Sequence, residues 1–171
     1  IAVLTLILQP NSSNFSFLFS AILIGGFIGS ILGLKIKMTA MPQLVAAFHS
    51  LVGLAAVLVA SGAFLAPDKF NILAGDKIKV ISAIEMSVGL VVGAITFSGS
   101  IIAFAKLQGI MTGNPIVFKF QHFFNLILAL VILVLIYLFV ANQEINIFIM
   151  LAILSFIIGV LIIIPIGGAD M

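Results

Sequence analysis

The chain has 171 residues, of which 64% are apolar and only 7% are charged, and its mean hydropathy is strongly positive. This balance excludes a water-soluble domain, in which about 25% of residues are charged. The absence of cysteine excludes disulfides and thiolate metal sites, and the two histidines and five carboxylates form no cluster at metal-ligand spacing. The seven basic residues are all lysines, placed singly or in pairs, so a nucleic-acid surface is excluded as well. We therefore expect the solvent of this chain to be a lipid bilayer.

Apolar segments long enough to cross a bilayer recur along the chain. A transmembrane helix needs about 20 apolar residues, because every backbone polar group must be satisfied within the segment. The sequence predicts an all-α fold, a polytopic transmembrane helix bundle with five full spans after one truncated span at Ile1–Leu8. The full spans are predicted at Phe17–Leu34, Pro42–Ala66, Val80–Ala105, Phe120–Ala141 and Ile145–Ile166. Because both ends are abrupt, we expect residues 1–171 to be a fragment of a longer chain.

The lysines between the spans predict an orientation. If the loops alternate across the membrane, four lysines fall on one side and three on the other. The first group is Lys35, Lys37, Lys106 and Lys119, and the second is Lys69, Lys77 and Lys79. Since lysines favour the cytoplasmic side, the first side is expected to be cytoplasmic. We also expect Lys106 and Lys119 to anchor their helices at the membrane surface.

The second full span carries a histidine on a stripe of small residues. At 100° per residue, His49 shares a face with Pro42, Ala46, Gly53, Ala56 and Ala60, and small residues let another helix approach closely. An ionisable residue inside a span is functional by default, and imidazole exchanges protons near neutral pH. We expect His49, Gly53 and Ala56 to face other helices and Leu51 and Leu58 to be more exposed. The alternative is a structural histidine bonded to a neighbouring helix.

The third full span has one polar or small face, which consists of Ser82, Glu85, Gly89, Gly93, Thr96 and Ser100. A carboxylate in a span is unfavourable unless it faces the bundle interior. We therefore expect the faces of His49 and Glu85 to meet in a shared interior that can pass protons. Two alternatives stay open, because the glycines can serve plain helix packing and Glu85 can reach water near its helix end.

Three polar residues, Gln121, His122 and Asn125, cluster at the start of the fourth full span. They are consistent with a proton path and equally with an ordinary interfacial helix start. No glycine-rich loop follows a strand, and no nucleophile is paired with a base. The sequence therefore predicts no nucleotide-binding site within this chain.

Three blocks of sequence resemble one family. They are Met38–Val59, then Gly93–Ser100 with Ala105-Lys106-Leu107, and finally Gly167-Gly168-Ala169-Asp170-Met171. In order and spacing they resemble the beta subunit of proton-translocating nicotinamide nucleotide transhydrogenase. The resemblance implies a membrane domain that carries protons, while two soluble domains bind NAD(H) and NADP(H) and pass a hydride between them. This chain itself is then expected to hold no cofactor.

The resemblance also implies roles for single residues. His49 matches the membrane histidine of the proton path, Glu85 an acidic residue on the neighbouring helix, and Ser100 a polar residue further along it. Asn125 matches an asparagine after the lysine-bearing loop. Asp170 matches an aspartate that couples the membrane domain to the NADP(H) domain. The sequence departs from the family at His122-Phe123-Phe124, where the family often has Arg or Lys, so no charge role is carried over there.

The resemblance further implies partners and a location. The partners are the alpha subunit or domain, the NADP(H)-binding domain of the same subunit and a second copy in a dimeric assembly. The expected location is a bacterial inner membrane, or the mitochondrial inner membrane in a eukaryote. The family's last membrane helices and NADP(H)-binding domain would lie beyond Met171. From the residues alone, two alternatives remain: an unrelated proton-coupled transporter using His49 and Glu85, and a purely structural membrane subunit.

Overall fold

The computed structural model describes residues 15–168, which belong to two compact units, the chain up to Met41 and the chain from Pro42 onward. In the first unit, helix α2 spans Phe15–Lys35 and a short 3-10 helix, η1, spans Met38–Ala40. The predicted truncated span at Ile1–Leu8 and the candidate coupling residue Asp170 lie outside the described residues.

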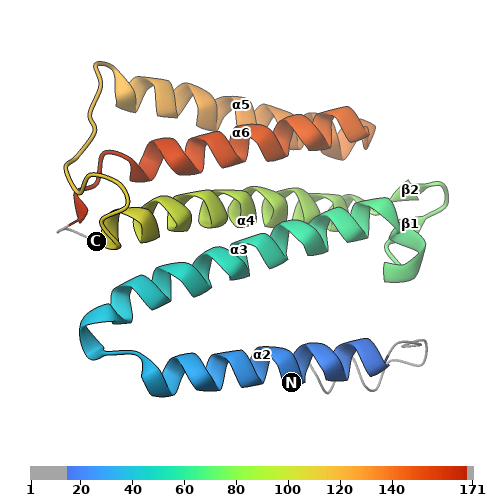
Figure 1. Cartoon of the computed structure of the whole chain (residues 1–171). Coiled ribbons are helices and arrows are strands. Elements are labelled where there is room, and N and C mark those ends of the chain that lie inside the picture. Colours follow the sequence, from blue (N-terminus) through green and yellow to red (C-terminus); the bar gives the residue numbers. More distant parts are fainter. Residues whose placement is uncertain (1–14, 169–171) are drawn as a thin grey trace. The chain divides into compact units, whose positions relative to one another are not determined.

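Four long helices make up most of the second unit. Its elements are α3 (Met41–Leu65), the 3-10 helix η2 (Pro67–Phe70), β1 (Leu73–Ala74), β2 (Lys77–Ile78), α4 (Val80–Leu107), α5 (Gln121–Asn142) and α6 (Ile145–Ile163). Figure 1 shows α6 between α4 and α5. The described residues contain five helices long and apolar enough to cross a membrane, so the predicted helical membrane fold is confirmed.

The helix ends differ from the predicted spans by at most three residues, and two of the differences have a local cause. Helix α5 begins after Phe120, because that residue adopts a left-handed backbone conformation with φ 66°. Helix α6 ends at Ile163 instead of Ile166, because Pro165 has no N–H for a further intrahelical bond. Pro42 lies in the first turn of α3, where its missing N–H has no intrahelical partner to lose.

A small hairpin that the sequence pattern did not indicate joins α3 to α4. Strand β1 pairs antiparallel with β2, and Gly75 in the turn has φ 68°, a conformation that glycine adopts without strain. The side chain of Gln143 completes the edge: its Oε1 accepts from the Ile78 N–H at 2.9 Å and its Nε2 donates to the Ile78 carbonyl at 2.8 Å. The connection between α5 and α6 is therefore fastened to the hairpin.

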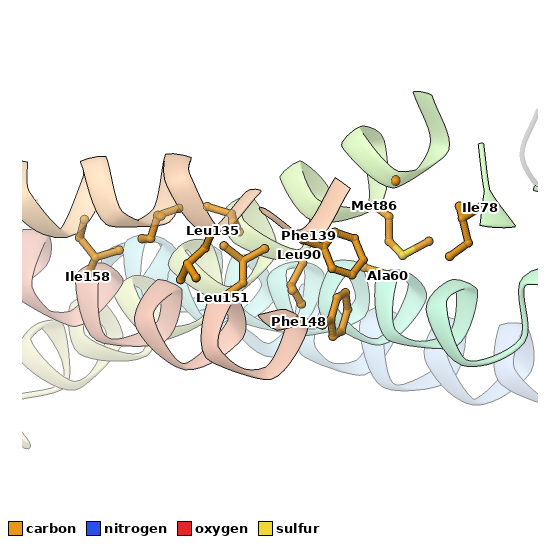
Figure 2. Close-up of a cluster of buried hydrophobic side chains, with 12 residues drawn as sticks. Ala60, Ile78, Met86, Leu90, Leu135, Phe139, Phe148, Leu151 and Ile158 are labelled. Carbon is orange, nitrogen blue, oxygen red and sulfur yellow. The ribbon is translucent and has the colours of Figure 1, made fainter. Parts of the chain in front are cut away.

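The largest buried cluster lies where the four helices of the second unit meet, towards the hairpin. Leu90, Phe139 and Leu151 are fully buried there, and Figure 2 shows them converging from different helices. The ring of Phe64 stacks on that of Phe148 with 4.8 Å between centroids and meets Phe139 edge to face at 5.3 Å. These aromatic contacts fix the α3 end against α5 and α6.

Helices α4 and α6 pack closely against each other through small residues. A Cβ built on Gly159 would lie 2.7 Å from the Ile95 carbonyl oxygen and would overlap the Ser98 hydroxyl. The buried hydroxyls of Ser98 and Ser155 donate to carbonyl oxygens of their own helices, those of Ala94 at 2.9 Å and Leu151 at 2.7 Å. These serines are thus satisfied locally and serve close packing.

Candidate functional site

Helices α3 and α4 cross through two glycines. A Cβ on Gly53 would lie 2.7 Å from the Gly93 carbonyl oxygen, and one on Gly93 would lie 2.8 Å from the Gly53 carbonyl oxygen and 2.9 Å from the Ala56 Cβ. No side chain fits between the two backbones at this point. The crossing therefore divides the α3–α4 pair into two halves, one toward the hairpin and one toward the start of α3.

The prediction for the His49 face is only partly correct. Gly53 is buried and Ala56 is half-buried, while Leu51 and Leu58 are 59% and 61% exposed, as expected. His49, in contrast, is exposed in the described chain, so its predicted placement against other helices is wrong there.

The cause is the period of the seam that α3 presents to its neighbours. The seam follows Ser50, Gly53, Val57 and Ala60, in steps of three, four and three residues. Each consecutive pair of steps covers seven residues in two turns, which is 3.5 residues per turn, and a seam of that period drifts by about 20° per heptad from a straight 3.6-residue wheel. At the level of His49 the buried position has moved to Ser50, and His49 lies on the edge of the seam.

Glu85 lies in a cavity on the hairpin side of the crossing. The cavity has a volume of about 420 Å³. It is lined by Ala56, Val59, Ala60, Ala63, Phe70, Ile72, Ser82, Glu85, Met86 and Gly89. Glu85 is exposed and, with Ser82, supplies the polar side chains of this lining, and Gly89 leaves open space where a side chain would stand. The carboxylate thus faces an otherwise apolar hollow between α3 and α4.

His49 and Glu85 are not brought together by the described helices. His49 lies four residues before Gly53 on α3, and Glu85 lies eight residues before Gly93 on the antiparallel α4. At 1.5 Å per residue the two side chains begin about 18 Å apart along the helix axes, on opposite sides of the crossing. The expected shared interior is therefore wrong for this part of the chain. Ser100, which is half-buried, lies on the His49 side.

A second cavity lies at the start of α5 and collects the predicted polar cluster. Its volume is about 510 Å³, and it is lined by Val117, Gln121, His122, Asn125, Ile162, Pro165 and Ile166. Gln121 is buried and Asn125 half-buried, whereas His122 is exposed. The amide oxygens of Gln121 and Asn125 are buried without a hydrogen-bond partner. Asn125 therefore belongs to a different site from His49 and Glu85.

Lys106 has a role that the sequence did not indicate. Instead of anchoring α4 at the membrane surface, its side chain is only 4% exposed, so that expectation is wrong. Its Nζ donates to the carbonyl oxygens of Ile164 and of Ile166, the latter at 2.7 Å. These carbonyls follow the end of α6 and lack intrahelical partners, so the ammonium group both satisfies and neutralises a helix C-terminus.

Further backbone contacts tie the same segment to the α4–α5 loop. The Ile116 N–H donates to the Ile164 carbonyl at 3.3 Å, and the Gly168 N–H donates to the Gly113 carbonyl at 2.8 Å. At the same membrane end, the Gln43 side chain donates to the Leu107 carbonyl at 3.0 Å. The start of α3, the end of α4 and the end of α6 are thus linked at one end of the bundle. The sequence signal for this junction was the resemblance block Ala105-Lys106-Leu107.

Comparisons with known proteins agree with one another. The sequence profile of the family described as NAD(P) transhydrogenase beta subunit matches residues 1–171. Two proteins of Rhodospirillum rubrum, one of them from a designated strain, are named NAD(P) transhydrogenase subunit beta and are each 52% identical to this chain over 171 residues. The alignments cover 100% of this chain and 37% of each relative, so the chain spans little more than a third of their length.

Proposed function

The chain belongs to the NAD(P) transhydrogenase beta subunit family, and from this we propose that it forms the proton-conducting membrane part of a proton-translocating transhydrogenase. The profile match over the entire chain is the observation that carries the proposal. Helices α2 to α6, which are long and apolar enough to cross a membrane, support the assignment to the membrane part.

In the proposed reaction, NADH loses a hydride and becomes NAD⁺, while NADP⁺ accepts that hydride and becomes NADPH. The translocated proton enters on one side of the membrane and leaves on the other, so it is not consumed. The sequence contains no glycine-rich phosphate loop, and the strands within residues 15–168 have two residues each, so these residues do not fit a dinucleotide. We assign the nucleotides to the alpha subunit and to the NADP(H)-binding domain of the complete protein.

We assign the proton path to His49, Glu85, Ser100 and Asn125. Glu85 lines the cavity on the hairpin side, where its carboxylate can take up or release protons. His49 and Ser100 lie on the other side of the Gly53–Gly93 crossing. Since the two halves are about 18 Å apart along the helices, the path needs water or further groups between them. An ionisable side chain such as His49 is unfavourable where a membrane span contacts lipid. Other helices of the complete assembly, including those of a dimeric partner, are therefore expected to cover it.

The proposed setting is a multi-pass protein of a bacterial inner membrane, or of the mitochondrial inner membrane in a eukaryote. We assign the start of α3 and the ends of α4 and α6 to the cytoplasmic face, the side that carries four of the seven lysines, of which Lys106 is buried. Asp170, which follows this end of α6 in the sequence, is then available to couple the proton path to the NADP(H)-binding domain.

Reconstitution of the complete enzyme tests the proposal. In sealed liposomes, hydride transfer from NADH to NADP⁺ and the internal pH are followed together. We expect hydride transfer to move protons across the membrane and an imposed proton gradient to change its rate, with both effects lost on adding a protonophore. Hydride transfer that neither moves protons nor responds to a gradient would refute the proposal. Proton movement driven by a solute other than the nucleotides would instead indicate a proton-coupled transporter.

A further inference from the structure

The cavity at the start of α5 contains two buried acceptors that no described group satisfies. Gln121, at 4% exposure, and Asn125 are four residues apart and therefore lie on one face of α5. The Oε1 atom of the first and the Oδ1 atom of the second are buried without a hydrogen-bond partner. Turning either amide by 180° would only exchange an unmet acceptor for an unmet donor at the same place.

The remaining lining does not supply the missing donors, because four of its five side chains are apolar and the fifth, His122, is exposed and bonds to neither oxygen. Val117, Ile162, Pro165 and Ile166 present apolar side chains, and the segment with the last two is held in place by the bond from Lys106 to the Ile166 carbonyl. A buried polar group without a partner is destabilising by about 1–3 kcal/mol. The cavity, at about 510 Å³, has room for several water molecules, each of which needs two to four polar partners. Water molecules therefore fit the volume of the cavity and supply the donors that the two amide oxygens lack.

We propose that this cavity is a hydrated vestibule, in which water molecules donate to the amide oxygens of Gln121 and Asn125. Through it protons enter or leave the membrane part at this end of the bundle. His122 lies exposed among the lining residues and is the titratable side chain among them, so its imidazole is placed to exchange protons between bulk water and the vestibule. The proton route rests on the proposed function, whereas the hydration of the cavity does not.

Further along α5 the surface is apolar, in contrast to the polar vestibule. A hollow of about 260 Å³ further along the helix is lined entirely by apolar residues, namely Ile127, Leu130, Val131, Val134 and Leu135. Such a hollow stays free of water and suits lipid chains. The polarity of the vestibule is therefore a local property of the first turns of α5 and not of the helix as a whole.

Cysteine accessibility tests the hydration directly, because residues 1–171 contain no cysteine. In the complete protein, with any cysteines elsewhere replaced, Asn125→Cys is compared with Leu126→Cys, its neighbour at almost the same depth, which is 56% exposed on the apolar surface. The proteins are held in lipid nanodiscs, which open both faces, and treated with a charged methanethiosulfonate reagent. Because only a hydrated thiol ionises and reacts, we expect Asn125→Cys to react about tenfold faster or more. Equal rates would overturn the proposal.

A second measurement separates the proton route from hydration. Gln121→Leu removes one acceptor from the vestibule, so it should slow the labelling of Asn125→Cys and reduce proton-coupled turnover severalfold. His122→Ala should reduce coupled turnover but leave the labelling rate unchanged. Unchanged coupling in both variants would remove the cavity from the proton route. If the enzyme moved no protons at all, the proposed function would fail, while the labelling contrast would still decide whether the cavity is hydrated.

Discussion

Gly53 and Gly93 bring the backbones of α3 and α4 into direct contact, since a Cβ on the first would lie 2.7 Å from the carbonyl oxygen of the second. The contact separates the half of α4 that carries Glu85 from the half of α3 that carries His49. Any proton that visits both groups must therefore pass along the edges of the two helices, where other parts of the protein can contact them.

Gly53→Ala should destabilise the complete protein, because the added methyl group has backbone atoms within contact distance on α4 and neither helix can repack without moving. Overpacking of this kind is destabilising by about 1–3 kcal/mol. Thermal unfolding of the purified protein in detergent measures the effect. Gly62→Ala is the matched control, since Gly62 lies on the same helix with open space around it and alanine favours the helix. Equal melting temperatures for the two variants would argue against the tight crossing.

Lys106→Met should loosen the end of α6, because it leaves the carbonyl oxygens of Ile164 and Ile166 without the donor that both now share. Hydrogen bonds to charged groups contribute about 1.5–3 kcal/mol each, so the melting temperature should fall by several degrees. Lys119→Met is the control, since Lys119 is exposed and its Nζ lies over the ring of Phe120, 5.2 Å from the centroid. A larger loss of stability in the control would contradict the buried role of Lys106.

Much of the helical fold could be predicted from sequence, because the bilayer imposes one strong local rule. Each span must be apolar for about 20 residues and must satisfy its own backbone, so the segments from Phe15 to Ile163 were identified to within three residues at each end. The hairpin could not be predicted, because strands of two residues are too short to show an alternating pattern. It is also held by Gln143, a residue 65 positions beyond Ile78 in the sequence.

The candidate site was less predictable, because it depends on how the helices meet. A lysine at the end of a span has the same sequence signature whether it reaches the membrane surface or, like Lys106, caps another helix. For His49, a small angular drift between a 3.5-residue seam and a 3.6-residue wheel decided between a buried position and an edge. The grouping of Gln121, His122 and Asn125 was local and was visible from the sequence.

Asp170→Asn should weaken the coupling between NADP(H) binding and proton movement while leaving assembly intact. The residue follows Gly167-Gly168-Ala169 in the sequence, and the Gly168 N–H donates to the Gly113 carbonyl at 2.8 Å. The variant keeps the size of the side chain but removes its charge. Proton uptake per hydride transferred, measured in liposomes, reports the coupling directly. A ratio equal to that of the original protein would exclude Asp170 from the coupling.

His49→Ala should abolish proton-coupled turnover in the complete enzyme while sparing any hydride exchange that requires no net proton transfer, because the nucleotides are assigned to other domains. Imidazole accepts and releases protons near neutral pH, which the neighbouring serine and amide groups cannot do. Both activities are measured on the same reconstituted sample. A folding defect lowers both activities, whereas a defect in the proton path lowers only the proton-coupled turnover.

The position of His49 supplies a control for this experiment. Leu51 lies two residues away on the exposed side of α3, at 59% exposure, so Leu51→Ala should change neither activity substantially. Because His49 is on an exposed edge and not wedged into the seam at Ser50 and Gly53, its replacement leaves no cavity between α3 and α4, and the variant should assemble normally. A well-folded His49→Ala enzyme that pumps protons at the original rate would show that the histidine is structural and that the path runs elsewhere.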